Sequence, residues 1–299
     1  MKRLYIKISL FALITFILGI ISCKHEAPSE VTDKVPEQCA WTIYTPYDWS
    51  HDGEPFHTDY ITIYSDAAGA EMKENMGEIA DKHFRQILNW FNFQDISDFI
   101  YPPDYSKIEI YLNINHTENI NWAYWGGFII TIRSSKISGH WLNYTIYTAR
   151  HELLHVFEFL IEGKYDLGTD VWFREGLAVY VGCMESTAFN TIDNKVELDA
   201  WISENQNASV NANPVKIHQH TDFPEGANIH NYYRIFELAV RYLVDENGLG
   251  KTSEDVLNLF YDIRNDTPFS SAFIDNFGIS LESYENNFFG LAENYLEND

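Results

Sequence analysis

The chain has 299 residues, of which 45% are hydrophobic and 21% are charged, and this composition excludes a chain that is disordered throughout. The length suits one large domain or two modest ones. The 44 acidic and 20 basic residues give a formal net charge of -24. Such a charge repels a nucleic acid backbone, because binding to it depends on Lys and Arg. We therefore expect no nucleic acid partner.

The N-terminus has the pattern of a signal peptide. Lys2, Arg3 and Lys7 make it positive, and an apolar run over residues 8–21 follows. A membrane span needs about 20 apolar residues, so this shorter run is typical of a signal-peptide core. The run ends in Ile-Ile-Ser-Cys at residues 20–23, which resembles the lipobox of bacterial lipoproteins.

This resemblance implies that residues 1–22 are a signal peptide and that Cys23 is lipidated after cleavage. The alternative is a soluble secreted protein that has a cysteine near its cleavage site. Residues 23–38 are polar and contain two prolines, as a tether does. Lys24 follows the cysteine, which favours retention at the outer membrane of the bacterial cell envelope.

Cys39 and Cys183 are the other cysteines of the chain. They pair in an oxidising envelope or remain two buried thiols, and a count of two does not decide between these states.

Three segments have the apolar-polar alternation of strands, at residues 60–64, 108–112 and 128–133. Between the first two, residues 68–94 carry apolar side chains at roughly helical spacing and contain no proline. We therefore expect a helix between two strands here.

From residue 144 the pattern is predominantly helical, with helices expected over residues 145–162, 172–186, 229–246, 251–264 and 280–296. Strands followed by helices predict an α+β fold. We expect one domain over residues 39–299, in which a strand-containing lobe over 39–143 packs on the first of these helices. A mainly helical lobe over 144–299 follows. The stretch 187–228 is expected to be long connecting structure over the surface.

The first of these helices contains the sequence His-Glu-Leu-Leu-His at residues 151–155. At 3.6 residues per turn, His151 and His155 lie about 40° apart on one helix face, so both imidazoles can reach one metal ion. Glu152 lies near enough to bind a water on that metal without being a ligand itself. The alternative for two histidines at this spacing is an ordinary helical pair.

A second segment, residues 172–180, reads Trp-Phe-Arg-Glu-Gly-Leu-Ala-Val-Tyr and places Glu175 twenty positions after His155. Catalytic zinc sites take three protein ligands, and two histidines with a glutamate are one such set. Gly176 and Ala178 are small, and we expect them to let this helix approach the His-Glu-Leu-Leu-His helix closely.

With both segments present, the sequence resembles the gluzincin zinc metallopeptidases, the thermolysin-like and aminopeptidase-like clan. This resemblance implies one zinc ion on His151, His155 and Glu175, with Glu152 as general base in the hydrolysis of peptide bonds. The substrate would be a peptide or a protein.

One position departs from the clan, whose members commonly carry an acidic residue four positions after the third ligand, where it holds a zinc-binding histidine. This sequence has Val179 there. Another carboxylate or a backbone carbonyl takes that role, or the site is weaker.

The clan also carries a Tyr or His on a later helix, which stabilises the developing oxyanion. The candidates are Tyr233, then Tyr232, and His230. For each tyrosine the alternative is ordinary packing of its ring.

The resemblance further implies a sheet edge that binds the substrate backbone, with Gly126, Gly127 and Phe128 as the candidate segment that leads into Ile129 and Ile130. An internal strand is the alternative.

A polar loop contains His218, His220 and Asp222. We expect these side chains to be solvated rather than to form a second metal site.

The leading hypothesis is thus a zinc metallopeptidase anchored by lipid to the bacterial envelope. The alternative is a lipoprotein of the same fold that is catalytically weak or inactive and binds peptide or glycan. The intact Glu152 disfavours this alternative, because a retired site needs no general base.

Overall fold

A computed structural model describes residues 54–65, 70–99, 107–113, 121–126, 129–134, 140–163, 168–183, 191–205, 213–224 and 229–298. The expected signal peptide, the lipidation site Cys23, the tether and Cys39 lie outside the described residues. The structure therefore does not test the two alternatives for Cys39 and Cys183, a disulfide or two thiols.

The described strands form one five-stranded sheet in the order β1-β2-β3-β5-β4. They are β1 (Phe56–His57), β2 (Ile61–Ser65), β3 (Ile108–Asn113), β4 (Asn121–Gly126) and β5 (Ile129–Ser134). The central strands β2, β3 and β5 are parallel, while β1 and β4 pair antiparallel at the two edges. The three predicted strands are confirmed to within a residue or two. The two edge strands were not predicted.

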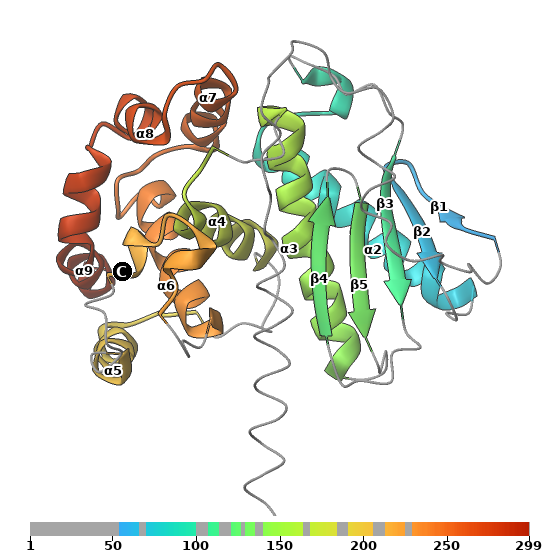
Figure 1. Ribbon diagram of the computed structural model, residues 1–299, viewed down its shortest axis with the longest axis horizontal. Helices are drawn as coiled ribbons and strands as arrows, with labels where there is room; N and C mark the ends of the chain where they lie inside the picture. The colour runs from blue at the N-terminus through green and yellow to red at the C-terminus, as the bar shows by residue number, and fades with distance from the viewer. Residues whose placement is uncertain are drawn as a thin grey trace, which may run out of the picture. The chain divides into compact units, whose positions relative to one another are not determined.

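Side chains along β3 alternate in burial, as a strand with one covered face requires. Ile108, Ile110 and Leu112 are buried, whereas Glu109 and Tyr111 between them are partly exposed. Helix α2 (Ala70–Trp90) contacts β1 and β2, and helix α3 (His140–Glu162) contacts β4 and β5. The two helices also contact each other (Figure 1).

The remaining helices follow α3 in the chain. They are α4 (Val171–Cys183), α5 (Lys195–Asn205), α6 (Ile229–Val244), α7 (Ser253–Arg264), α8 (Phe269–Phe277) and α9 (Leu281–Asn298), with short 3-10 turns η2 (Ile96–Asp98), η3 (Pro214–Lys216) and η4 (His220–Asp222). The fold is therefore mixed α+β with mostly helical content, and the predicted class is confirmed. Among the described helices, none combines the length and apolar character that crossing a membrane requires.

Two expectations about the later part of the chain need correction. The stretch 187–228 contains α5, whose Leu198 and Trp201 are buried, so it is not connecting structure throughout. This helix was not predicted because it buries only these two side chains, one turn apart, and two positions give a weak helical pattern in the sequence. Helix α8 was also missed, because nine residues after Pro268 give too short a pattern.

Helix α3 begins at His140, five residues earlier than expected, and contacts α4 and α7 as well as the sheet. Gly176 does not serve this α3–α4 contact. A Cβ at Gly176 would lie 2.3 Å from the carbonyl oxygen of Phe236 in α6, so this glycine lets α4 approach α6. Gly182 instead faces α3, where a Cβ would lie 3.5 Å from the backbone nitrogen of His151. The expectation failed because successive helical residues point about 100° apart.

Candidate metal centre

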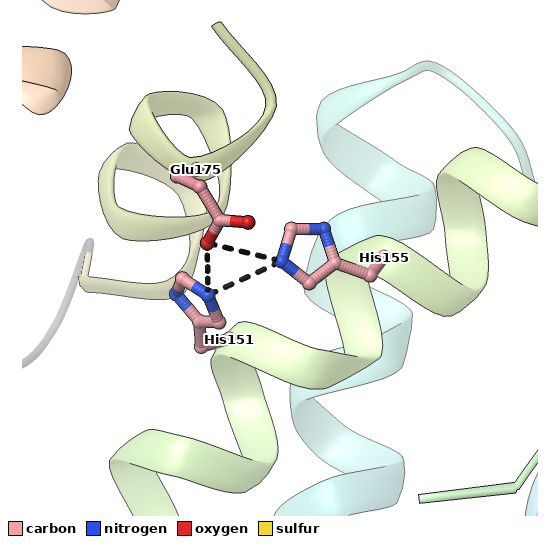
Figure 2. A group of neighbouring side chains, drawn as sticks. All are labelled: His151, His155 and Glu175. Carbon is pink, nitrogen blue, oxygen red and sulfur yellow. Dashed lines mark hydrogen bonds and ion pairs between the residues drawn. The ribbon is translucent and has the colours of Figure 1, made fainter. Parts of the chain in front are cut away.

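Three side chains from two neighbouring helices meet in the interior (Figure 2). His151 and His155 come from α3 and Glu175 from α4. The Nε2 atom of His151 lies 3.1 Å from Glu175 Oε2 and 3.2 Å from His155 Nε2. The third side of the triangle, from His155 Nε2 to Glu175 Oε2, is 3.5 Å. The structure thus brings together the three side chains proposed as metal ligands.

This triangle has the size of a zinc site. Ligand atoms about 2.0–2.1 Å from a tetrahedral zinc ion lie about 3.3 Å apart, close to the three observed separations. Two imidazoles and a carboxylate are also a ligand set that zinc accepts in catalytic sites. All three residues are buried, which shields the cluster from competing water. The residues present therefore fit a zinc ion.

A fourth buried side chain, Glu158, holds His155 from the side away from the triangle. Its Oε2 atom accepts a hydrogen bond from His155 Nδ1 at 2.8 Å, and its side chain is fully buried. With Nδ1 donating to this carboxylate, the Nε2 lone pair of His155 is left to face a metal. Glu158 thus supplies the carboxylate that holds a histidine, which the apolar Val179 cannot supply. Its position one turn after His155 could have been found from helical spacing alone.

The carboxylates and imidazoles shift each other's protonation when no metal is bound. Burial lowers the pKa of His155, but Glu175 and Glu158 outweigh it and raise the value to about 10. Burial also raises the pKa of Glu175, and the two histidines outweigh that effect and hold it well below its usual value. A metal ion that bound here would have to displace the proton that the raised pKa favours on His155.

Glu152 follows His151 on α3 and is also buried. Burial raises the pKa of its carboxyl group, the neighbouring histidines oppose the shift, and Glu175 adds to it. A raised pKa brings a carboxylate closer to the operating pH, which favours its action as a general base.

The two neighbouring tyrosines of α6 have different surroundings. The ring of Tyr233 stacks on His151, with ring centroids 5.8 Å apart. Its pKa lies well above the usual value, because its hydroxyl is desolvated and the negative charge of the neighbouring Glu175 carboxylate opposes ionisation. The ring of Tyr232 packs against Trp201 and Phe223, and its hydroxyl has no hydrogen-bond partner among the described residues. The side chain of His230 lies outside those described.

The second oxygen of Glu175 faces two residues that the sequence reasoning did not place at the centre. Oε1 lies 3.6 Å from His220 Nε2 and 3.7 Å from Arg174 Nε. Arg174 also donates a hydrogen bond to His220 Nε2 at 3.3 Å. His220 lies 45 positions after Glu175, and no local spacing rule connects it to the helix that carries Glu175.

The loop histidines do not form one cluster with Asp222. His220 lies beside the Glu175 carboxylate, whereas His218 donates a hydrogen bond from Nδ1 to Asp170 at 2.7 Å. The Asp222 carboxylate accepts hydrogen bonds from the backbone N–H groups of His218 and Gln219. These three residues therefore provide no common site.

The candidate substrate segment is divided by the sheet topology. Gly126 ends β4, which is an edge strand of the described sheet, while Gly127 and Phe128 lie outside the described residues. Ile129 and Ile130 belong to β5, which pairs with β3 and β4 on its two sides. An edge at Ile129–Ile130 is therefore wrong, because both sides of that strand are already paired.

No model of a known protein family matches the chain, and a search of curated proteins found none with a similar sequence.

Proposed function

We propose that the protein is a zinc-dependent peptidase that hydrolyses peptide bonds at the bacterial cell envelope. The observation that carries this proposal is the triangle of His151, His155 and Glu175 with Glu152 beside it. Three protein ligands would leave one position on a zinc ion free for water, as in catalytic zinc sites. A zinc ion, when bound, supplies a Lewis acid that polarises a carbonyl and lowers the pKa of a water molecule.

The side chains around the triangle would then divide the work of hydrolysis. Glu152 accepts a proton from the attacking water and delivers it to the leaving amine. Tyr233 offers its hydroxyl to the oxyanion that develops on the substrate, since its ring stacks on His151 and its hydroxyl lies within hydrogen-bonding reach of Glu175. Glu158 keeps His155 in the tautomer and orientation that the metal needs.

The proposal includes a binding mode for the substrate. The outer edge of β4 has no strand partner among the described residues, and α3 contacts β4 directly. An extended peptide would add to this edge as a further strand, with Gly126 at its end. The site would then lie between a strand-containing lobe over residues 39–143 and a mainly helical lobe over residues 144–299.

The envelope location rests on the sequence of the N-terminus. Cys23 after an apolar run would carry the lipid, and Lys24 favours the outer membrane. Incorporation of labelled lipid into the expressed chain, compared with a Cys23→Ser variant, tests this part alone. Equal labelling of the two chains would refute it.

The activity itself is tested with the full-length protein, by measuring its bound zinc and its cleavage of a quenched peptide library. We expect one zinc ion at the triangle and peptide cleavage by the native protein. Glu152→Gln should keep the zinc and lose turnover, because it removes the base but no ligand.

Two outcomes would contradict the proposal. If the triangle takes up no zinc, the proposed peptidase activity is excluded, because that activity requires the bound metal. Zinc retained by a native protein that cleaves no peptide would instead favour the alternative, a lipoprotein of the same fold that binds peptide or glycan.

A further inference from the structure

A second group of metal-ligating side chains lies outside the triangle and joins three separate segments of the chain. Asp170 precedes α4, His218 lies in the segment between η3 and η4, and Glu285 lies in α9. One ligand atom from each residue lies within 4.8 Å of the others. Nothing in the peptidase proposal uses these residues.

The histidine of this group is oriented as metal-binding histidines are. Its Nδ1 atom donates to Asp170 Oδ2 at 2.7 Å, so the Nε2 atom is left to face the opposite carboxylate. That atom lies 3.8 Å from Glu285 Oε1. This separation is too long for a hydrogen bond but is bridged by one cation with about 2.0–2.2 Å to each ligand.

Glu285 supplies an independent sign that a ligand is expected here. Its side chain is only 9% exposed, and its Oε1 atom is buried without a hydrogen-bond partner among the described residues. Leaving a buried carboxylate oxygen unpartnered is costly, so such an atom points to a group that binds there. The orphaned oxygen is the one that faces His218.

We propose that His218 Nε2 and Glu285 Oε1 bind a second zinc ion, and that Asp170 orients the histidine. The imidazole and the carboxylate are ligand types that zinc accepts, and water would complete the coordination. The carboxylates of Asp170 and Glu285 balance the charge of a divalent cation. Asp222 and Glu282 add negative potential nearby, against the positive charges of Lys216 and Arg174.

This site would be weaker than the triangle and would have a structural role. It offers two protein ligands in place of three, and the His218 side chain is 44% exposed, so water competes for the ion. Zinc here would link α9 to the segment that contains η3 and η4, and through Asp170 to the start of α4. Occupation should therefore raise the melting temperature of the protein.

The test measures zinc bound per chain of the full-length protein, dialysed against zinc buffered at a low and a high free concentration with excess Mg²⁺ present. The wild type should bind one equivalent at the low concentration and two at the high one. His218→Asn and Glu285→Gln should each bind only one at both. Asp170→Asn should weaken the second equivalent about 10–100-fold, because it removes the orienting partner.

Glu282→Gln is the matched charge control. It removes one exposed negative charge from the same helix, one turn earlier, but no ligand, so this variant should keep both equivalents. His155→Asn separates the two sites, because it should lose the tight equivalent and keep the weak one. Far-ultraviolet circular dichroism of each variant checks that it is folded. A wild type that takes up one equivalent at both concentrations overturns the proposal, as do two equivalents in both His218→Asn and Glu285→Gln.

Discussion

At the scale of single residues, the proposed metal ligand His155 of α3 depends on a neighbour, Glu158, that lies outside the triangle. Glu158 is fully buried, and its contact with His155 Nδ1 fixes which nitrogen faces the triangle. Burial raises the pKa of Glu158, and the hydrogen bond and charge of His155 oppose this shift. The histidine and the glutamate therefore act as one unit.

Replacing Glu158 by Gln should lower zinc affinity at the triangle about 10–100-fold, because the amide holds the imidazole less strongly and makes it a weaker ligand. Competition with a chelator of known affinity measures this change. Glu162→Gln is the control, since Glu162 is a buried glutamate on the same helix that accepts from the Gly168 backbone N–H. Equal zinc affinities in the two variants would contradict this role for Glu158.

The neighbouring tyrosines of α6 allow a matched comparison. Tyr233→Phe removes the hydroxyl beside Glu175 and should lower kcat about 100-fold or more while zinc stays bound. Tyr232→Phe removes a buried hydroxyl that has no partner among the described residues, so activity should be unchanged and stability should not fall. Steady-state kinetics with a peptide substrate measures both. A larger loss of kcat in Tyr232→Phe would reverse the assignment.

Local spacing decided which of these residues could be predicted. His151 and His155 follow from helical geometry, because their contact lies within one turn. Glu175 followed from a family pattern, and Glu158 was missed because that pattern places the acidic partner of the histidine at position 179, in the next helix. His220 belongs to a loop 45 positions after Glu175, and only the fold of α4 against that loop brings them together.

At the scale of elements, the parallel strands were predictable because each segment has the apolar-polar alternation of a strand, while the edge strands were not predictable. β1 has two residues, too few for any period, and β4 was not predicted as a strand. The order of the strands depends on pairings between distant segments, which no local pattern encodes. The edge that the substrate would use therefore became visible only in the sheet itself.

The glycines of α4 should differ in their tolerance of a methyl group. Gly176→Ala places a Cβ 2.3 Å from the Phe236 carbonyl oxygen, so α4 and α6 must move apart, at a cost of about 2 kcal/mol in the free energy of unfolding. Gly182→Ala meets its nearest atom at 3.5 Å, an ordinary contact, and alanine favours the helix. Urea unfolding of both variants measures the difference. Equal destabilisation would contradict this account of the packing.

At the scale of the whole molecule, two buried groups outside the triangle give stability opposite dependences on pH. Burial lowers the pKa of His83 from 6.5 to about 3, with Arg150 adding to the shift, so the folded protein keeps this ring neutral. Burial raises the pKa of Glu237 from 4.5 to about 7, and the charge of Arg241 only partly opposes it. The folded protein therefore keeps this carboxyl protonated where the unfolded chain does not.

The signs follow from linkage. The contribution of neutral His83 is present above pH 6.5 and is lost as the pH falls towards 3, whereas that of protonated Glu237 is present below pH 4.5 and is lost as the pH rises through 7. Each changes the free energy of unfolding by about 1.4 kcal/mol per pH unit, so between pH 4.5 and 6.5 the two slopes cancel.

When either group is removed alone, the free energy of unfolding should show the pH dependence of the other group. Relative to the wild type, His83→Gln should lose about 3 kcal/mol of stability as the pH rises from 4.5 to 6.5, and Glu237→Gln should gain about as much. Urea unfolding at pH 4.5, 5.5 and 6.5 measures both differences, and the double variant, which lacks both slopes, should run parallel to the wild type. Single variants whose curves are parallel to the wild type would mean that neither group has a shifted pKa in the folded protein.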